Sequence, residues 1–114
     1  MRMVRDHLED ILEAIHRIAE EANLGREHFM ADRRSQVWMV HHIQIIGEAV
    51  RSISDQLKTM DPDYPWSQVV GMRHILVHDY FGIDLDEVWN VVEKDIPELD
   101  VRVRRHLEAL GDEA

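Results

Sequence analysis

The chain contains no cysteine, which excludes disulfide bonds and metal sites built from thiolates. It also lacks any apolar run close to the roughly 20 residues that a membrane-spanning helix requires. The N-terminal segment, MRMVRDHLEDIL, is charged throughout and has no apolar stretch of the kind found in signal peptides. We therefore expect a cytoplasmic protein that does not contact the membrane.

Basic residues are scarce: 13 lysines and arginines face 23 aspartates and glutamates, which gives a formal net charge of −10. Most of the excess falls in residues 61–100, with 2 basic and 10 acidic side chains. This balance opposes an extended grip on nucleic acid, so any contact with RNA must be local. Strong acidity also suits docking to a basic protein partner, and it is commonly no more than a source of solubility.

With 114 residues, of which 45% are apolar and 32% charged, the chain is predicted to fold as one globular domain over residues 1–114. Apolar residues repeat with helical spacing over residues 4–22, 35–57 and 85–110. A further helix, either continuous or broken at Gly71, is expected over residues 66–78. Gly47 indicates close packing within the second helix. We expect Asp84 to cap the last helix, and Pro97 either to kink it or to mark the meeting point of two helices. The fold class predicted is all-α, an up-and-down bundle of four to five helices.

The densest group of reactive side chains is GMRHILVHDYF, residues 71–81. Metal binding is one interpretation, because His74 and His78 stand four residues apart on a helix. However, the residues between them include no glutamate and no third ligand is indicated, so we expect no metal. A second interpretation is purely structural, since histidines and arginines paired with carboxylates are common in helical bundles.

The third interpretation is phosphodiester cleavage. Arginine presents a planar set of donors to a phosphate, and histidine can move a proton to or from a ribose oxygen near neutral pH. At about 100° per residue, Arg73 and His78 lie roughly 140° apart on an ideal helix. They can act on one phosphate only if the helix breaks or a second subunit completes the site. By the same count Arg73 and Tyr80 lie within roughly 20° of each other.

Arg73-x4-His78-x-Tyr80 resembles the R-x4-H-x-Y motif of the HepT-like HEPN toxins. The segment DLDEVWNVVEKDIPEL (residues 84–99) is similar to that family too, as is IIGEA (residues 45–49) in the central helix. The resemblance covers most of the chain, from the first helix to Leu110. It implies a bundle of the HEPN type that acts without a cofactor.

The resemblance also implies a function. HepT-like proteins are endoribonuclease toxins that cleave RNA without metal, and two subunits place both motifs in one cleft. Arg73 and His78 would be catalytic. The partner would be a minimal nucleotidyltransferase antitoxin of the MntA type, which silences the toxin by transferring AMP to Tyr80. Two neighbouring carboxylates are weaker candidates that do not follow from the resemblance alone. Asp79 either orients His78, binds the partner or is only solvated, and Glu48 either pairs with Arg73 or caps an internal charge.

Two alternatives remain at this stage. One is a HEPN interaction module without nuclease activity, which binds a nucleotidyltransferase or a nucleotide, and the net charge of −10 favours this alternative. The other is a bundle that serves only dimerisation. The alternatives differ in what the loss of His78 would do: a nuclease would lose its activity, whereas an interaction module would keep its affinity for the partner.

Overall fold

The computed structural model describes residues 2–78 and 82–111. Its helices form an elongated bundle measuring 44 × 27 × 27 Å. In chain order the elements are α1 (Val4–Ala22), α2 (Arg26–Ala31), α3 (Arg33–Ser52), α4 (Ser54–Met60), α5 (Trp66–Leu76), β1 (Val77–His78), β2 (Gly82–Ile83), α6 (Leu85–Asn90), the π-helical turn η1 (Val91–Asp95) and α7 (Ile96–Leu110). The predicted all-α bundle is confirmed, with one small antiparallel strand pair added to it.

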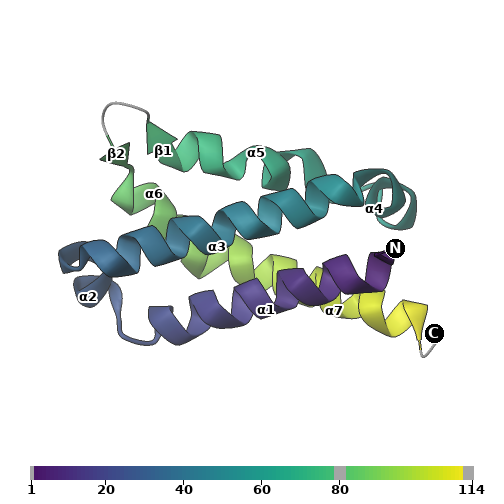
Figure 1. Ribbon diagram of the computed structural model, residues 1–114, viewed down its shortest axis with the longest axis horizontal. Coiled ribbons are helices and arrows are strands. Elements are labelled where there is room, and N and C mark those ends of the chain that lie inside the picture. The colour runs from purple at the N-terminus through teal and green to yellow at the C-terminus, as the bar shows by residue number, and fades with distance from the viewer. Residues whose placement is uncertain (1, 79–81, 112–114) are drawn as a thin grey trace.

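Helix α3 is the central element of the bundle. It lies between α1 and α5 and runs antiparallel to both, while α6, η1 and α7 pass behind it (Figure 1). This position explains why apolar residues occur on more than one side of α3. Its side chains Met39, Ile43 and Ile46 are at most 1% exposed. The core also contains the apolar stripes of α1 and α7, the buried face of α6 and η1, and the fully buried Trp66 of α5.

The second long helix ends earlier than expected. We predicted one helix over residues 35–57, but α3 ends at Ser52 and a new helix, α4, begins at Ser54. Between them Ile53 has φ −124° and ψ 25°, outside the helical range. The Ser52 hydroxyl donates to the carbonyl of Glu48 at 3.0 Å, a bond that tends to bend helices. The bend keeps both Ile53 and Leu57 in the core, which is why the apolar spacing gave no sign of it.

The helix that carries the motif also ends early. The prediction of a helix over residues 66–78 was wrong at its end, because α5 runs unbroken through Gly71 and stops at Leu76. Val77 and His78 then pair with Ile83 and Gly82 as two short antiparallel strands. The backbone N–H of Asp84 donates to the Leu76 carbonyl at 2.8 Å, which closes the hairpin onto the helix end. Gly82 has φ +81°, a value that favours glycine.

The C-terminal part of the bundle is continuous through α6, η1 and α7. As expected, Asp84 caps this helix: its carboxylate accepts from the backbone N–H of Glu87 at 3.2 Å. The disturbance expected near Pro97 takes the form of the π-helical turn η1, and Pro97 itself lies in the first turn of α7. Because the helix is continuous there, the π-helical turn directly before Pro97 is the irregularity that accommodates the backbone donor that proline lacks.

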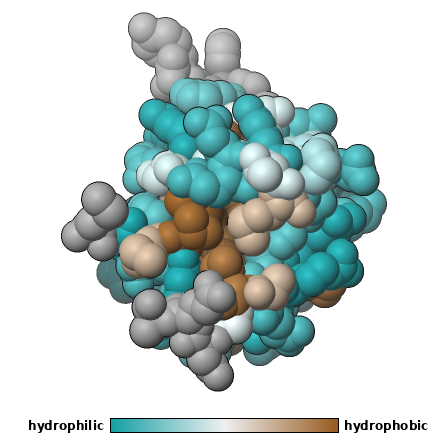
Figure 2. All heavy atoms as spheres, turned by 90° about the vertical axis from the view of Figure 1, so that its right-hand side faces the viewer, coloured by the Kyte–Doolittle hydropathy of each residue, from teal (hydrophilic) through white to brown (hydrophobic). Residues whose placement is uncertain are grey.

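Apolar side chains reach the surface at the end of the bundle where α4 and both described ends of the chain lie. Figure 2 shows them gathered in one central strip with hydrophilic atoms around it. The strand pair lies at the opposite end of the molecule (Figure 1), so this strip is remote from the predicted site. Within residues 2–78 and 82–111, no helix is both long and apolar enough to cross a membrane.

Candidate active site

Arg73 lies in the last turn of α5 and lines a hollow between α5 and α3. Its side chain is partly buried and lines a cavity of about 140 Å³. The Nε atom is inaccessible to solvent and has no hydrogen-bond partner among the described residues. A buried N–H without a partner is costly, so this guanidinium is placed to gain from an acceptor that enters the cavity.

The cavity is polar and contains more positive than negative charge. Glu48 and Arg51 contribute its charged side chains from α3, and Arg73 and His74 face them from α5; its full lining is Ile43, Gln44, Gly47, Glu48, Arg51, Val70, Arg73 and His74. Two arginines therefore share a small hollow with a single carboxylate. In a protein with a net charge of −10, this is a local exception to the overall field.

Glu48 lies near Arg73, as expected, but it does not pair with it. It lines the same cavity as Arg73, yet the ion pairs of the described residues do not include one between them. The Glu48 carboxylate instead accepts from the amide of Gln44, one turn earlier on α3, at 3.3 Å. The pairing of Glu48 with Arg73 that the sequence suggested is therefore absent from this structure.

Gly47 allows α3 and α5 to approach closely enough to form this cavity. A Cβ atom added at Gly47 would lie 3.3 Å from the Val70 carbonyl oxygen and 3.4 Å from that of Val69. Both atoms belong to the backbone of α5 and cannot move aside as a side-chain end would. The predicted close packing at this glycine is thus confirmed, and it fixes the separation of the two helices at the level of Arg73.

The end of α5 at Leu76 alters the geometric relation between Arg73 and His78. The angle of 140° assumed one continuous helix, but the backbone of His78 belongs to β1, beyond the helix end. The helix is therefore broken between the two motif residues, which was one of the two conditions for their acting on one phosphate. Two further predicted site residues, Asp79 and Tyr80, lie outside the described residues.

Sequence reasoning missed two contributors to the cavity. His74 was considered only as a metal ligand, but it is exposed and lines the cavity beside Arg73. Arg51 was not considered at all. It stands four residues after Gly47, so the helical repeat places it one turn along the same face of α3. That spacing from the glycine of close approach was the available signal.

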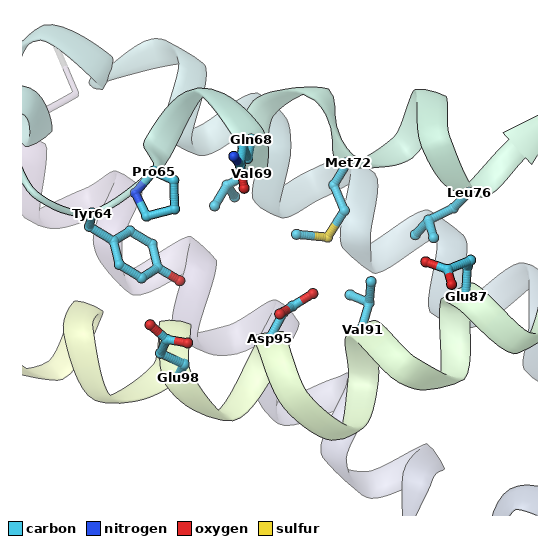
Figure 3. A pocket seen from close by; sticks show the side chains of 10 residues that line it. All are labelled: Tyr64, Pro65, Gln68, Val69, Met72, Leu76, Glu87, Val91, Asp95 and Glu98. Carbon is cyan, nitrogen blue, oxygen red and sulfur yellow. The ribbon is translucent and has the colours of Figure 1, made fainter.

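The opposite side of α5 forms a second cavity, which is separate from the first. This cavity has a volume of about 200 Å³ and lies between α5 and the helix formed by α6, η1 and α7. Figure 3 shows the Tyr64 hydroxyl and the carboxylates of Asp95 and Glu98 directed toward the gap between them. Burial raises the pKa of Tyr64 to about 12, and the charges of Glu98 and Asp95 act in the same direction. Neither Arg73 nor His74 lines this second cavity.

A buried polar network joins the loop before α5 to α7. The carboxylate of Asp61, which is 8% exposed, accepts from Arg102 at 3.0 and 3.2 Å and lies 3.0 Å from Nε2 of His106. Burial alone would raise the pKa of Asp61, but the hydrogen bonds of His106 and Arg102 outweigh it and lower that pKa. Arg102 thus pairs with a residue 41 positions earlier in the chain.

Within the described part of the chain, no group of three or more potential metal ligands lies together. The reactive residues around this small polar cavity are thus arginine, histidine and glutamate side chains of α3 and α5. The fold is an all-α bundle of the HEPN type, with a site built between two of its helices.

Comparison with known proteins gives the family. Residues 11–106 match the family described as "Ribonuclease HepT-like". A relative from Thermococcus cleftensis, named "Probable ribonuclease HepT", is 39% identical over 86% of this chain and 90% of its own. A protein from Methanocaldococcus jannaschii, named as a candidate RNase, is 34% identical over 90% of this chain and 94% of its own. Another candidate RNase, from Caldanaerobacter subterraneus subsp. tengcongensis, is 32% identical over 95% of this chain and 97% of its own. No solved structure matches. The chain belongs to the HepT-like ribonuclease family.

Proposed function

We propose that this protein is a metal-independent endoribonuclease that uses Arg73 and His78 as its catalytic residues. The observation that carries the proposal is the buried Nε of Arg73, which has no hydrogen-bond partner among the described residues and lines a polar cavity. Membership of a ribonuclease family makes RNA the substrate class that fits such a site. The break in the helix after Leu76 supports the proposal, because it removes the constraint that would hold His78 on the far side of α5.

The chemistry needs only these two residue types. A ribose 2′-oxygen attacks the adjacent phosphorus, the bond from phosphorus to the 5′-oxygen breaks, and the products are a 2′,3′-cyclic phosphate and a free 5′-hydroxyl. His78 takes the proton of the 2′-hydroxyl or delivers one to the leaving oxygen. The Arg73 guanidinium binds the non-bridging oxygens and stabilises the charge that develops on them.

The biological role that fits this activity is that of a toxin in a toxin–antitoxin pair. The protein acts in the cytoplasm as a homodimer, and two copies of the motif share one cleft. A minimal nucleotidyltransferase of the MntA type silences it: the Tyr80 oxygen attacks the α-phosphorus of ATP, an O–P bond forms and pyrophosphate leaves. The added AMP brings negative charge and bulk to the cleft, which excludes RNA. Asp79 orients His78 in this arrangement.

The decisive experiment is cleavage of total cellular RNA by the purified protein in EDTA. We expect His78→Ala to slow cleavage about 10²- to 10⁴-fold, the usual contribution of a general acid or base. Arg73→Ala should cost about 10²- to 10³-fold, as expected for the loss of a donor to the transition state. Arg105→Ala and His16→Ala, both at exposed positions, are the matched controls and should cleave like the parent. Circular dichroism shows whether each variant keeps its helices.

Parental rates in both motif variants would refute the catalytic assignment. If the parent itself does not cleave, its intact mass separates two cases. Added AMP means that the toxin was purified in its silenced form, and the measurement is repeated on unmodified protein. An unmodified mass without cleavage favours the second candidate, an interaction module that binds a nucleotidyltransferase or a nucleotide, for which the net charge of −10 is the supporting observation.

A further inference from the structure

The cavity that contains Arg73 continues toward a second arginine, Arg51 of α3. Both side chains line the same hollow of about 140 Å³. Arg51 is exposed and forms no ion pair with a described residue. Other arginines, such as Arg33, Arg34 and Arg105, also form none with described residues, so the feature that distinguishes Arg51 is that it shares a cavity with Arg73.

The backbone geometry keeps the two guanidinium groups on one groove. Gly47 brings α3 within contact of α5 at Val70, since a Cβ atom added at Gly47 would lie only 3.3 Å from the Val70 oxygen. Arg51 follows Gly47 by about one helical turn, and Arg73 follows Val70 by about one turn on the antiparallel neighbour. The two arginines therefore flank the point of closest approach, one on each helix, and both reach into the space beside it.

The single carboxylate of the cavity is held toward the other end of this groove. Glu48 accepts a hydrogen bond from Gln44, which precedes it on α3, whereas Arg51 follows it. That bond draws the negative charge away from Arg51 and toward the level of Arg73, because α5 runs antiparallel to α3. The Arg51 end of the cavity is therefore the end at which an anion meets a cationic donor without a carboxylate beside it.

We propose that Arg51 binds a backbone phosphate of single-stranded RNA next to the phosphate that Arg73 engages, so that the α3–α5 groove positions the substrate strand. The proposal rests on the ribonuclease function proposed above. Arginine suits the task because its planar donors bind phosphate in a bidentate manner, and its charge is permanent. Arg51 is a substrate-positioning residue in this scheme, since it contacts a phosphate that does not react.

The test uses two measurements on unmodified protein: binding of a 2′-O-methyl RNA oligonucleotide, which cannot be cleaved, and steady-state cleavage of the matching RNA. We expect Arg51→Gln to weaken oligonucleotide binding and to raise KM roughly tenfold, because one charge-assisted contact is lost. kcat should change less than about threefold. The slope of log K against log salt concentration should become shallower by about 0.7, the value for one phosphate contact on a single strand.

Two further variants separate positioning from a general loss of charge. Arg51→Lys should retain the salt slope but bind more weakly than the parent, because lysine keeps the charge and loses the bidentate geometry. Arg105→Gln, at an exposed position of α7 remote from the groove, removes the same charge and should leave binding, KM and the slope at parental values.

The outcomes distinguish this inference from the nuclease proposal. A parent that cleaves RNA while Arg51→Gln binds with parental affinity and slope would overturn the phosphate site and leave the nuclease standing. A parent that binds the oligonucleotide through Arg51 but never cleaves RNA would do the reverse. No binding of the oligonucleotide by the unmodified parent would overturn the phosphate site as well.

Discussion

Asp61 connects two parts of the chain that are far apart in sequence, the loop before α5 and the C-terminal helix. Its carboxylate accepts from Arg102 and lies within hydrogen-bonding distance of His106, and its backbone carbonyl accepts from the Trp66 indole at 3.0 Å. Trp66 is the first residue of α5 and is fully buried. At the scale of single residues, Asp61 therefore sets where the helix that carries Arg73 begins.

We predict that Asp61→Asn lowers the free energy of unfolding by about 1.5–3 kcal/mol, the usual contribution of a hydrogen bond to a charged group. The amide cannot satisfy both Arg102 and His106, and it leaves buried donors without an acceptor. Urea denaturation at pH 7 followed by tryptophan fluorescence gives the value. Asp63→Asn is the matched control, since Asp63 lies in the same loop and is exposed. Equal losses in the two variants would contradict the prediction.

The same pair of proteins tests the pKa of Asp61. Because that pKa is lowered in the folded state, the ionised carboxylate stabilises the fold above its unfolded pKa of about 3.9. This stability is lost as the pH falls through the lower folded value. The difference in unfolding free energy between the parent and Asp61→Asn should therefore shrink below about pH 4. A difference that stays constant from pH 5 to pH 3 would contradict the lowered pKa.

Tyr64 offers a second titration that can be observed directly, because the chain has only two tyrosines. In Tyr80→Phe the phenolate absorbance comes from Tyr64 alone, and we expect its midpoint near pH 12 instead of the usual value of about 10. A raised pKa also means that stability declines as the pH rises between these two values. The urea-unfolded protein should titrate near 10, and a midpoint near 10 while circular dichroism still reports helix would contradict the prediction.

Single residues also show what the sequence could and could not reveal about the site. Arg73 could be singled out because its motif is local, and the structure places it in a polar cavity; its catalytic role stays a prediction. The partner of Arg102 was not predictable, since Asp61 lies 41 positions earlier and no spacing rule connects them. Arg51 was missed for a similar reason: its neighbour Arg73 belongs to another helix, and only the packing at Gly47 brings the two together.

At the scale of elements, the separation of α3 and α5 decides the shape of the candidate site. Two glycines on these helices differ in what surrounds them. A Cβ atom at Gly47 would meet backbone oxygens of α5 at 3.3 and 3.4 Å, whereas one at Gly71 would meet nothing within 4 Å. Both are helical positions, where alanine is intrinsically favoured over glycine by about 1 kcal/mol.

We predict opposite effects of alanine at these two positions. Gly71→Ala should stabilise the protein by up to about 1 kcal/mol through helix propensity alone. Gly47→Ala should instead reduce stability by up to about 2 kcal/mol, because overpacking costs about 1–3 kcal/mol and exceeds the gain in propensity. Urea midpoints of the two variants and the parent provide the comparison. Stabilisation by Gly47→Ala would show that α3 and α5 can separate without cost.

Helix existence was predictable from apolar spacing, and helix ends were not. The break at Ile53 leaves both Ile53 and Leu57 buried, so the pattern of apolar residues is the same with or without it. The strand pair after Leu76 is too short to show alternation, and its pairing depends on Gly82 at a positive φ. The break at Ile53 and the strand pair both depend on backbone dihedral angles, and the spacing of apolar residues in the sequence does not reveal those angles.

At the scale of the whole molecule, the net charge opposes the local charge of the candidate site. The chain carries −10, while the α3–α5 cavity holds two arginines and one glutamate. The acidic side chains of the second cavity, on the far side of α5, contribute to the repulsion without contacting the first cavity. An RNA strand is therefore repelled at long range and attracted only at close range, and salt determines how far the repulsion extends.

This opposition predicts an unusual dependence of RNA cleavage on salt. At about 0.01 M salt the screening length is roughly 30 Å, comparable to the 27 Å width of the molecule, so RNA meets the full net charge. At about 0.15 M salt the screening length is roughly 8 Å, so only the arginines close to the RNA interact with it appreciably. We expect kcat/KM to rise with KCl up to about 0.1 M and then to fall as the phosphate contacts weaken.

The double variant Asp95→Asn, Glu98→Gln removes negative charge on the far side of α5, so its kcat/KM should reach its maximum at a lower salt concentration than that of the parent. A rate that falls steadily from the lowest salt concentration would mean that the local arginines, not the net charge, govern the approach of RNA.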